Sequence, residues 1–212
     1  TYKMEVVQYD NAKGEGEGTV IGTRNGNKID YNKVESQEVR LANRFVEPDD
    51  FVLELGARYG GVSITTNQKL NNKQNHYVVE PDESVWKALE LNKKNNNCEF
   101  NIIKGTISKK KHKLILGVGG MNVGWGNHTE ECEESNIPNH NIPDCPFNVL
   151  IADCEGFLET FYNENKEFFK NLRLIIFEKD YHLDCDYNYL IKEFISLGFK
   201  PVINDFHSVF IK

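Results

Sequence analysis

Short apolar runs recur along the chain, and stretches with helical periodicity lie between them. The runs occupy residues 51–55, 76–80, 147–153 and 172–178, and each has the length and apolar density of a strand buried on both faces. Residues 82–96 instead place Val85, Ala88, Leu89 and Asn92 on one face of a helix. Strands that alternate with helices predict a parallel α/β sheet with right-handed crossovers.

Further elements continue this pattern at both ends of the chain. Val39, Ala42 and Val46 give residues 36–46 a helical spacing, with Ser36 as the expected N-cap. Asn25-Gly26 between two apolar runs predicts a hairpin at residues 20–31. The other predicted elements are helices at 156–171 and at 187–198 (closed by Gly198), strands at 99–105 and 113–118, and two closing strands within 199–212. We therefore expect an N-terminal hairpin or arm at residues 1–34 and one domain at residues 35–212.

A glycine-bearing turn, GARYGG, follows the first buried strand. In open α/β sheets, ligands bind beyond the carboxyl ends of the strands, and Gly56, Gly60 and Gly61 lie there. Glycine lets a ligand approach the backbone closely, and the following helix offers free N–H groups. Glu80 ends the second strand, where a carboxylate can accept hydrogen bonds from both hydroxyls of a ribose. These residues predict a ligand that carries adenosine.

The turn does not fit a dinucleotide well. Its spacing is G-x-x-x-G-G, whereas the dinucleotide fingerprint is G-x-G-x-x-G. Glu54, just before the turn, would repel a pyrophosphate but suits a cationic ligand. S-adenosylmethionine (SAM) carries a sulfonium and an amine and has no phosphate, so we expect SAM as the cofactor.

Three motifs together resemble the FkbM-type class I methyltransferases. That family carries D-V-G-A-N-x-G after its first strand, an acidic E-P after its second and Asp-x-Glu-Gly after its fourth. This chain has ELGARYG at 54–60, Glu80-Pro81, and DCEG at 153–156, and the resemblance spans about residues 35–212. The chain also departs from the family pattern. Arg58 stands where the family usually has Asn, and Asp180 stands where the family motif E-x-His would have a histidine.

The resemblance implies a fold, an activity and a set of site residues. The fold is Rossmann-like, with a seven-stranded, mostly parallel sheet in the order 3-2-1-4-5-7-6 and an antiparallel C-terminal hairpin. The activity is SAM-dependent O-methyl transfer to a hydroxyl of a sugar or glycoconjugate. The expected cofactor-binding residues are Glu54, Gly56, Ala57, Arg58, Tyr59, Gly60, Gly61, Glu80, Pro81, Gly105, Thr106 and Asp153.

Carboxylates and a histidine at the ends of the fourth and fifth strands are the candidate catalytic groups. A hydroxyl acceptor needs its proton removed, and the candidates for this role are Asp153, Glu155, Asp180 and His182. Asp153 is also a candidate N-cap for the following helix. Mg²⁺ or Mn²⁺ is a possible second cofactor, because Asp153, Glu178 and Asp180 offer the hard oxygen ligands that these ions prefer.

A long stretch rich in Gly, Asn and Pro, residues 117–146, separates the third and fourth strands of the expected sheet. Loops of this length in a compact domain are usually functional or disordered. Trp125 could stack on a sugar ring, and His128, Glu130 and Glu131 could hydrogen-bond its hydroxyls. The alternative interpretation is an exposed insertion without a role in binding.

Composition narrows the class of partner. The formal charge of −7 over 212 residues makes nucleic acid an unfavourable partner. The sequence contains no run of about 18 apolar residues, so it predicts no membrane span. Its five cysteines lack paired spacing, so we expect free thiols and a cytoplasmic protein. Two alternatives to the hydroxyl methyltransferase stay open: a non-catalytic SAM-binding domain, and a methyltransferase that acts on RNA or protein.

Overall fold

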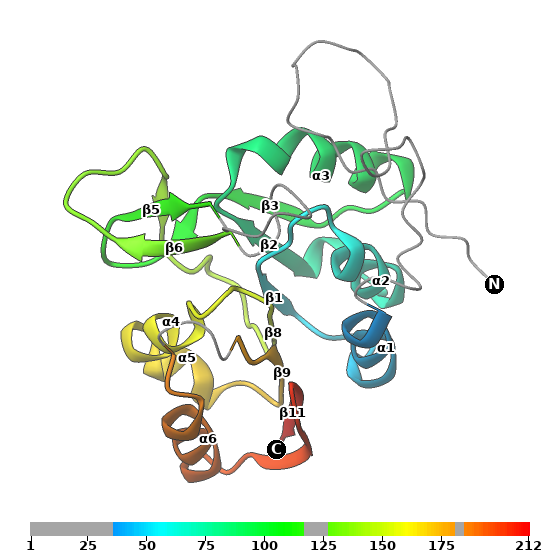
Figure 1. Ribbon diagram of the computed structural model, residues 1–212. Coiled ribbons are helices and arrows are strands. Elements are labelled where there is room, and N and C mark those ends of the chain that lie inside the picture. The colour runs from blue at the N-terminus through cyan, green and yellow to red at the C-terminus, as the bar shows by residue number, and fades with distance from the viewer. Residues whose placement is uncertain (1–35, 117–126, 181–184) are drawn as a thin grey trace.

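A seven-stranded sheet runs through the middle of the protein, with helices on both of its faces (Figure 1). The computed structural model describes residues 36–116, 127–180 and 185–212. The predicted hairpin at residues 20–31 and the arm at residues 1–34 lie outside the described residues. Within the described part, no helix is both long and apolar enough to cross a membrane.

The order of the sheet is β10-β11-β9-β8-β1-β2-β3, and the five strands from β9 to β3 run parallel. β11 is antiparallel to both β9 and β10. Numbered within this sheet, the order is 3-2-1-4-5-7-6, so the prediction is confirmed. The bounds are β1 Val52–Leu55, β2 His76–Glu80, β3 Asn101–Lys104, β8 Val149–Ala152, β9 Leu174–Glu178, β10 Lys200–Asn204 and β11 His207–Ile211.

Six α-helices of the described chain flank the sheet. On one side lie α1 (Ser36–Phe45), α2 (Gly61–Lys69) and α3 (Glu83–Asn95); on the other lie α4 (Leu158–Glu164), α5 (Lys166–Lys170) and α6 (Tyr187–Ser196) (Figure 1). A short 3₁₀ turn, η1 (Lys73–Asn75), precedes β2. α1 begins at the first described residue, so the predicted cap at Ser36 stays a prediction.

The two faces of the sheet bury different side chains, because successive strand residues point to opposite sides. Towards α1 and α2 the core is aliphatic, with residues such as Val52, Ile151 and Ile176. Towards α4–α6 it is rich in aromatic rings, including Phe177 and Phe194 with centroids 5.9 Å apart. Both faces of β1, β8 and most of β9 are therefore covered, which explains their unbroken apolar sequences.

The segment predicted as one helix at residues 156–171 is two helices, α4 and α5. The chain leaves the helical conformation at Asn165, whose φ and ψ are −133° and 39°. Asn165 Nδ2 donates to the carbonyl of Phe161 at 2.9 Å, and its backbone N–H bonds Tyr162. An Asn side chain competes with the helical hydrogen bonds in this way, and the apolar spacing alone does not predict the break.

Two small sheets stand outside the main one. β4 (Thr106–Ile107) pairs with β7 (Asn139–His140), and β5 (His112–Ile115) pairs with β6 (His128–Glu131) to form an antiparallel β5–β6 ribbon. The strand predicted at residues 113–118 thus starts one residue earlier. The expectation of an irregular loop at 117–146 was wrong in part, because β6 and β7 lie in it. Their sequences, HTEE and NH, are too polar to signal a strand.

Candidate functional site

A cavity opens where β1, β2, β3 and β8 end at their carboxyl edge, and the β5–β6 ribbon forms part of its wall. Its wall is lined by residues from the ends of these strands and from the ribbon, with both polar and apolar side chains. The sequence-predicted residues that line it are Gly56, Arg58, Glu80, Pro81, Gly105, Thr106, His128, Asp153 and Glu155. Most of the candidate cofactor and catalytic residues are therefore brought to one place.

Gly56 allows the ends of three strands to converge below this cavity. Its N–H donates to the carbonyl of Val79 at 3.0 Å, and the N–H of Asp153 donates to the carbonyl of Leu55 at 3.0 Å. A Cβ at Gly56 would lie 1.6 Å from the carbonyl oxygen of Asp153. The backbone also has φ +87° there, which glycine adopts at little cost. Glycine at this position is required by the close backbone contact.

Glu80 presents a buried carboxylate to the cavity. The backbone N–H of Arg58 donates to its Oε2 at 2.7 Å, and that of Asp82 donates to its Oε1 at 2.8 Å. Burial raises the pKa of Glu80 to about 7, although these two N–H groups and the Arg58 charge oppose the shift. Trp86 Nε1 donates to the backbone carbonyl of Glu80 at 2.8 Å, so α3 also holds the end of β2 in place.

Asp82 joins the turn after β1 to the N-terminus of α3. Its Oδ2 lies 3.0 Å from Arg58 Nη1 and accepts from Asn127 Nδ2 at 2.9 Å, while Oδ1 caps α3 through Ser84 N–H at 2.9 Å. Burial acts to raise the pKa of Asp82, but hydrogen bonds from Ser84 and Asn127 outweigh it and lower the pKa. Sequence reasoning did not select Asp82 or Asn127. The position of Asp82 two residues after Glu80, at a helix start, was the available signal.

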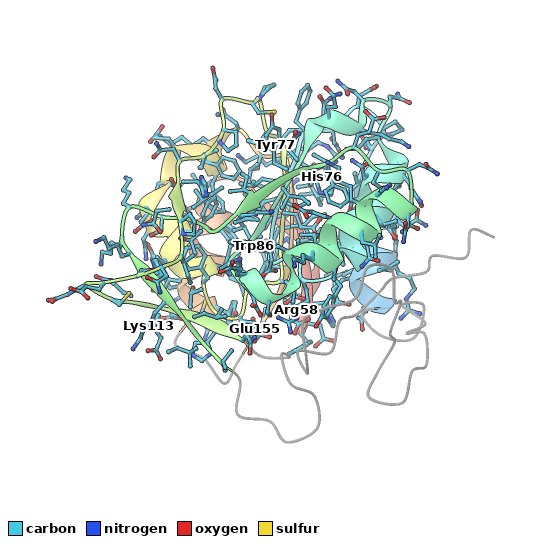
Figure 2. All side chains as sticks on the ribbon, turned by 90° about the horizontal axis from the view of Figure 1, so that it is seen from above. Arg58, His76, Tyr77, Trp86, Lys113 and Glu155 are labelled. Carbon is cyan, nitrogen blue, oxygen red and sulfur yellow. The ribbon has the colours of Figure 1, made fainter. Side chains whose placement is uncertain are left out.

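The carboxylates after β8 and β9 approach one another at the same edge. Asp153 and Glu155 line the cavity, and Asp180, which is buried, accepts from the N–H of Gly156 at 3.2 Å. Ligand oxygens of Asp153, Glu178 and Asp180 lie within 4.8 Å of one another, and a metal ion bound there stays a prediction. His182, the fourth catalytic candidate, lies outside the described residues. Arg58 and Glu155, which both line the cavity, are labelled in Figure 2.

Glu54 does not line this cavity. Its side chain points to the opposite face of the sheet, where Oε1 accepts from Ser63 Oγ at 2.6 Å and Oε2 lies 3.0 Å from His76 Nε2. The reason is strand alternation: Leu55, the next residue, faces the cavity, so Glu54 cannot. Glu54 therefore holds the start of α2 against β2, and we do not expect it to contact a ligand in the cavity directly.

Several other residues predicted to bind the cofactor or the substrate do not line the cavity and instead stabilise the fold around it. Ala57 and Tyr59 are buried in the cluster under α3, and Gly60 and Gly61 begin α2 without lining the cavity. On the β5–β6 ribbon, Glu130 and Glu131 pair with the exposed side chains of Lys113 and Lys110. The wall of the cavity that the ribbon provides is instead formed by Leu114, His128 and Thr129. Trp125 lies outside the described residues.

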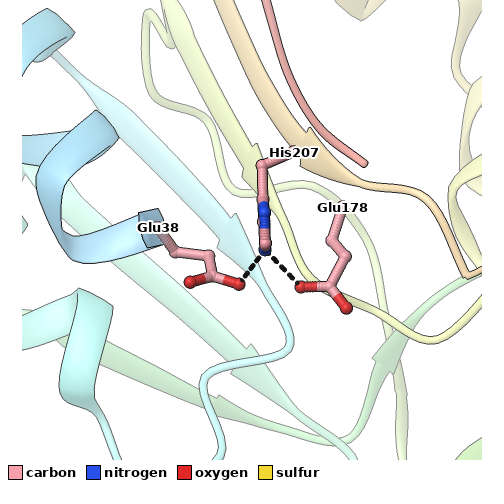
Figure 3. Close-up of side chains that lie close together, drawn as sticks. All are labelled: Glu38, Glu178 and His207. Carbon is pink, nitrogen blue, oxygen red and sulfur yellow. Dashed lines mark hydrogen bonds and ion pairs between the residues drawn. The ribbon is translucent and has the colours of Figure 1, made fainter. Parts of the chain in front are cut away.

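A second cluster lies behind Gly56, on the α1 side of the sheet (Figure 3). His207 Nε2 contacts Glu178 Oε2 at 2.9 Å and also contacts Glu38 Oε1. Burial lowers the pKa of His207, but its hydrogen bonds with the two carboxylates outweigh this and raise it. Burial raises the pKa of Glu178. At Glu38, burial also acts to raise the pKa, but the hydrogen bonds with His207 and Glu178 together outweigh it and lower the pKa. Glu38 and His207 are 169 residues apart, and nothing in the sequence pairs them.

The charges around the main cavity favour a cationic ligand. Glu80, Asp82, Asp153 and Glu155 place four carboxyl groups on its wall, and Arg58, already paired with Asp82, is the one lysine or arginine among its described lining residues. A pyrophosphate would meet these carboxylates without a free counter-charge. Apolar side chains, including Leu55 and Ile107, complete the wall.

Solved structures with the same architecture include methyltransferases. A methyltransferase from Pyrococcus furiosus is 16% identical and superposes with a TM-score of 0.52, covering 92% of this chain and 90% of that one. A Streptococcus pneumoniae protein described as a tRNA (m1A22) methyltransferase is 11% identical, with a TM-score of 0.51 over 82% of this chain and 68% of that one. No protein-family model matches the sequence, and no curated protein matches it significantly. The chain therefore has the Rossmann-like methyltransferase fold.

Proposed function

We propose that the protein is a SAM-dependent methyltransferase that transfers a methyl group to a hydroxyl of a sugar or glycoconjugate. The observation that carries the proposal is the buried Glu80 carboxylate, fixed by two backbone N–H groups at the carboxyl edge of a methyltransferase-type sheet. Each of its oxygens keeps acceptor capacity beyond these bonds. This is the arrangement that binds the two hydroxyls of a ribose.

The residues of the cavity fit SAM better than they fit a nucleotide with phosphates. Glu80 and Asp82 accept hydrogen bonds and suit ribose hydroxyls, while Leu55 and Ile107 provide apolar surface for an adenine ring. Asp153 and Glu155 provide negative charge where a cationic amino-acid portion would be held. SAM supplies an activated methyl group on a sulfonium. The carboxyl-rich wall disfavours NAD, which carries a pyrophosphate.

The acceptor side of the cavity would be the wall formed by the β5–β6 ribbon. Asn127, His128 and Thr129 bring polar groups to that wall, and Phe157 provides an apolar ring beneath it. Polar groups beside an aromatic surface suit a carbohydrate. The choice of a hydroxyl acceptor rests on the resemblance of the DCEG and Glu80-Pro81 motifs to the FkbM-type enzymes.

Asp153 is the residue to which we assign the acid–base role. It follows β8 directly, and its N–H is bonded to the carbonyl of Leu55, so its position is tied to the strand beside the cofactor cavity. A carboxylate there can accept the proton of the acceptor hydroxyl while the cavity walls align the two reactants. Glu155, two residues further along the same turn and with φ +49°, is the second candidate for the acid–base role.

The proposal is tested in two steps that separate binding from turnover. Calorimetry should show SAM and S-adenosylhomocysteine binding and NAD not binding. Transfer of a labelled methyl group is then measured on sugars and glycoconjugates, with RNA and protein as parallel acceptors. Labelling of a sugar hydroxyl supports the proposal. Labelling of RNA or protein alone refutes the acceptor class, and SAM binding without turnover on any acceptor would make the protein a non-catalytic SAM-binding domain.

A further inference from the structure

Behind the main cavity, Glu38, Glu178 and His207 converge from three separate elements (Figure 3). His207 stands directly opposite Glu178 in the antiparallel pairing of β11 with β9, so their side chains lie on the same face of the sheet. α1 packs over these two strands and brings Glu38 from the other side. The three side chains are thus held by the fold itself and not by a loop.

We propose that Glu38, Glu178 and His207 form a binding site for a divalent transition-metal ion such as Zn²⁺. One ligand atom from each lies within 4.8 Å of the others, and His207 Nε2 is 2.9 Å from Glu178 Oε2. Metal–ligand distances of about 2.0–2.2 Å in a tetrahedral site place ligand atoms about 3.4 Å apart. Moving Glu178 Oε2 and His207 Nε2 apart by about half an ångström would therefore give these two atoms the spacing of tetrahedral ligands.

The electrostatic surroundings supply an independent reason to expect a cation here. A small cavity beside the cluster is lined by Glu38, Glu54, Asp153, Glu178 and His207, and no Lys or Arg is among its described lining residues. Glu54 is bonded to His76, so three carboxyl groups are left around the His207 imidazole, and negative charge is in excess in a mostly buried place. A divalent ion bound to two carboxylates and a neutral imidazole balances the charge of its ligands.

The imidazole decides which kind of ion the site would take. Mg²⁺ prefers oxygen ligands alone, whereas imidazole together with carboxylate suits Zn²⁺ and neighbouring transition metals. This distinguishes the cluster from the predicted oxygen-only group of Asp153, Glu178 and Asp180, with which it shares Glu178. Because Glu178 Oε2 already bonds His207, we assign that carboxylate to the nitrogen-containing site.

Isothermal titration of the chelator-treated full chain with ZnCl₂ and with MgCl₂ tests the proposal. We expect one Zn²⁺ per chain, weak or no Mg²⁺ binding, and a melting temperature that Zn²⁺ raises and EDTA lowers again. Glu38→Gln and His207→Gln should each weaken Zn²⁺ binding by about a hundredfold or more, since even outer-shell changes cost about 10–100-fold. His140→Gln and Asp180→Asn are the controls, because His140 is exposed and bonds only a backbone carbonyl in the structure, and Asp180 belongs to the other group. Both should bind Zn²⁺ like the unchanged protein.

Three results would overturn the proposal: no Zn²⁺ binding, Zn²⁺ binding that persists in both Glu38→Gln and His207→Gln, or binding that Asp180→Asn abolishes while His207→Gln keeps it. Circular dichroism and a urea titration of each metal-free variant establish that it is folded. If His207→Gln does not fold, Glu38→Gln decides alone, because Glu38 lies on α1, outside the sheet.

Discussion

Gly56→Ala should be among the most destabilising single-methyl additions in this protein. An alanine Cβ would lie 1.6 Å from the carbonyl oxygen of Asp153, whereas real contacts of a Cβ essentially never fall below 3.0 Å. The ends of β1 and β8 would have to separate by more than an ångström. The hydrogen bond from Asp153 N–H to the Leu55 carbonyl, 3.0 Å long, would then be lost or weakened.

The magnitude follows from three contributions. A non-glycine residue at φ +87° costs about 1–2 kcal/mol. Overpacking against backbone adds about 1–3 kcal/mol, and the lost hydrogen bond about 1 kcal/mol. We therefore expect the free energy of unfolding to fall by about 3–6 kcal/mol.

Gly198→Ala is the matched control. Gly198 has φ +93° after α6, and nothing lies within 4 Å of a Cβ built there. It should cost only the conformational part, about 1–2 kcal/mol. Urea unfolding followed by circular dichroism measures both variants. At a slope of about 2 kcal/mol per molar urea, the midpoint should fall by about 2 M for Gly56→Ala and by less than about 1 M for Gly198→Ala. Equal losses, or a milder loss at Gly56, would refute the close-contact argument.

Three further changes test the site. Because the pKa of Glu80 is about 7, its carboxylate is mostly protonated at pH 6, and S-adenosylhomocysteine should bind several-fold more tightly at pH 8 than at pH 6. Calorimetry of Glu80→Gln should show an affinity that hardly changes with pH. The same pH dependence in this variant as in the unchanged protein would contradict the assignment. Asp153→Asn should keep the melting temperature but lose on the order of a hundredfold in methyl-transfer rate, and near-normal turnover would move the acid–base role to Glu155 or Asp180. Asp82→Ala removes the α3 cap and the partner of Arg58, so urea titration should show a loss of about 1–2 kcal/mol; no loss would mean that neither contact stabilises the fold.

The main sheet was predictable because its parallel strands are covered on both faces. Such strands need continuous apolar runs, and these are visible in sequence without knowledge of any partner strand. The order of the strands came from the resemblance of the turn motifs and not from periodicity. By contrast, β6 and β7 are stabilised by pairing with β5 and β4 and contain polar residues, so their sequences carry no strand signal.

The same covering of both faces explains why Glu54 was misplaced. When all four residues of β1 are buried, the sequence shows no alternation, and the face to which Glu54 points cannot be inferred from it. Glu80 and Asp153 line the cavity as expected, because Glu80 ends β2 and Asp153 directly follows β8, which leaves both at the carboxyl edge. The contact of Glu38 with His207 joins the first described helix to the last strand, and only the assembled fold brings them together.

The anchoring of Trp86 has an optical consequence. The chain contains two tryptophans, and the indole N–H of Trp86 is bonded to the carbonyl of Glu80, while Lys104 Nζ lies 5.3 Å from the centre of its ring. A ligand that binds the Glu80 carboxylate changes the charge and solvation of the same residue whose backbone carbonyl accepts the Trp86 hydrogen bond. With Trp125 replaced by Phe, the tryptophan fluorescence, excited selectively at wavelengths that tyrosine does not absorb, would come from Trp86 alone. The protein thus carries its own label-free reporter of occupancy at the end of β2.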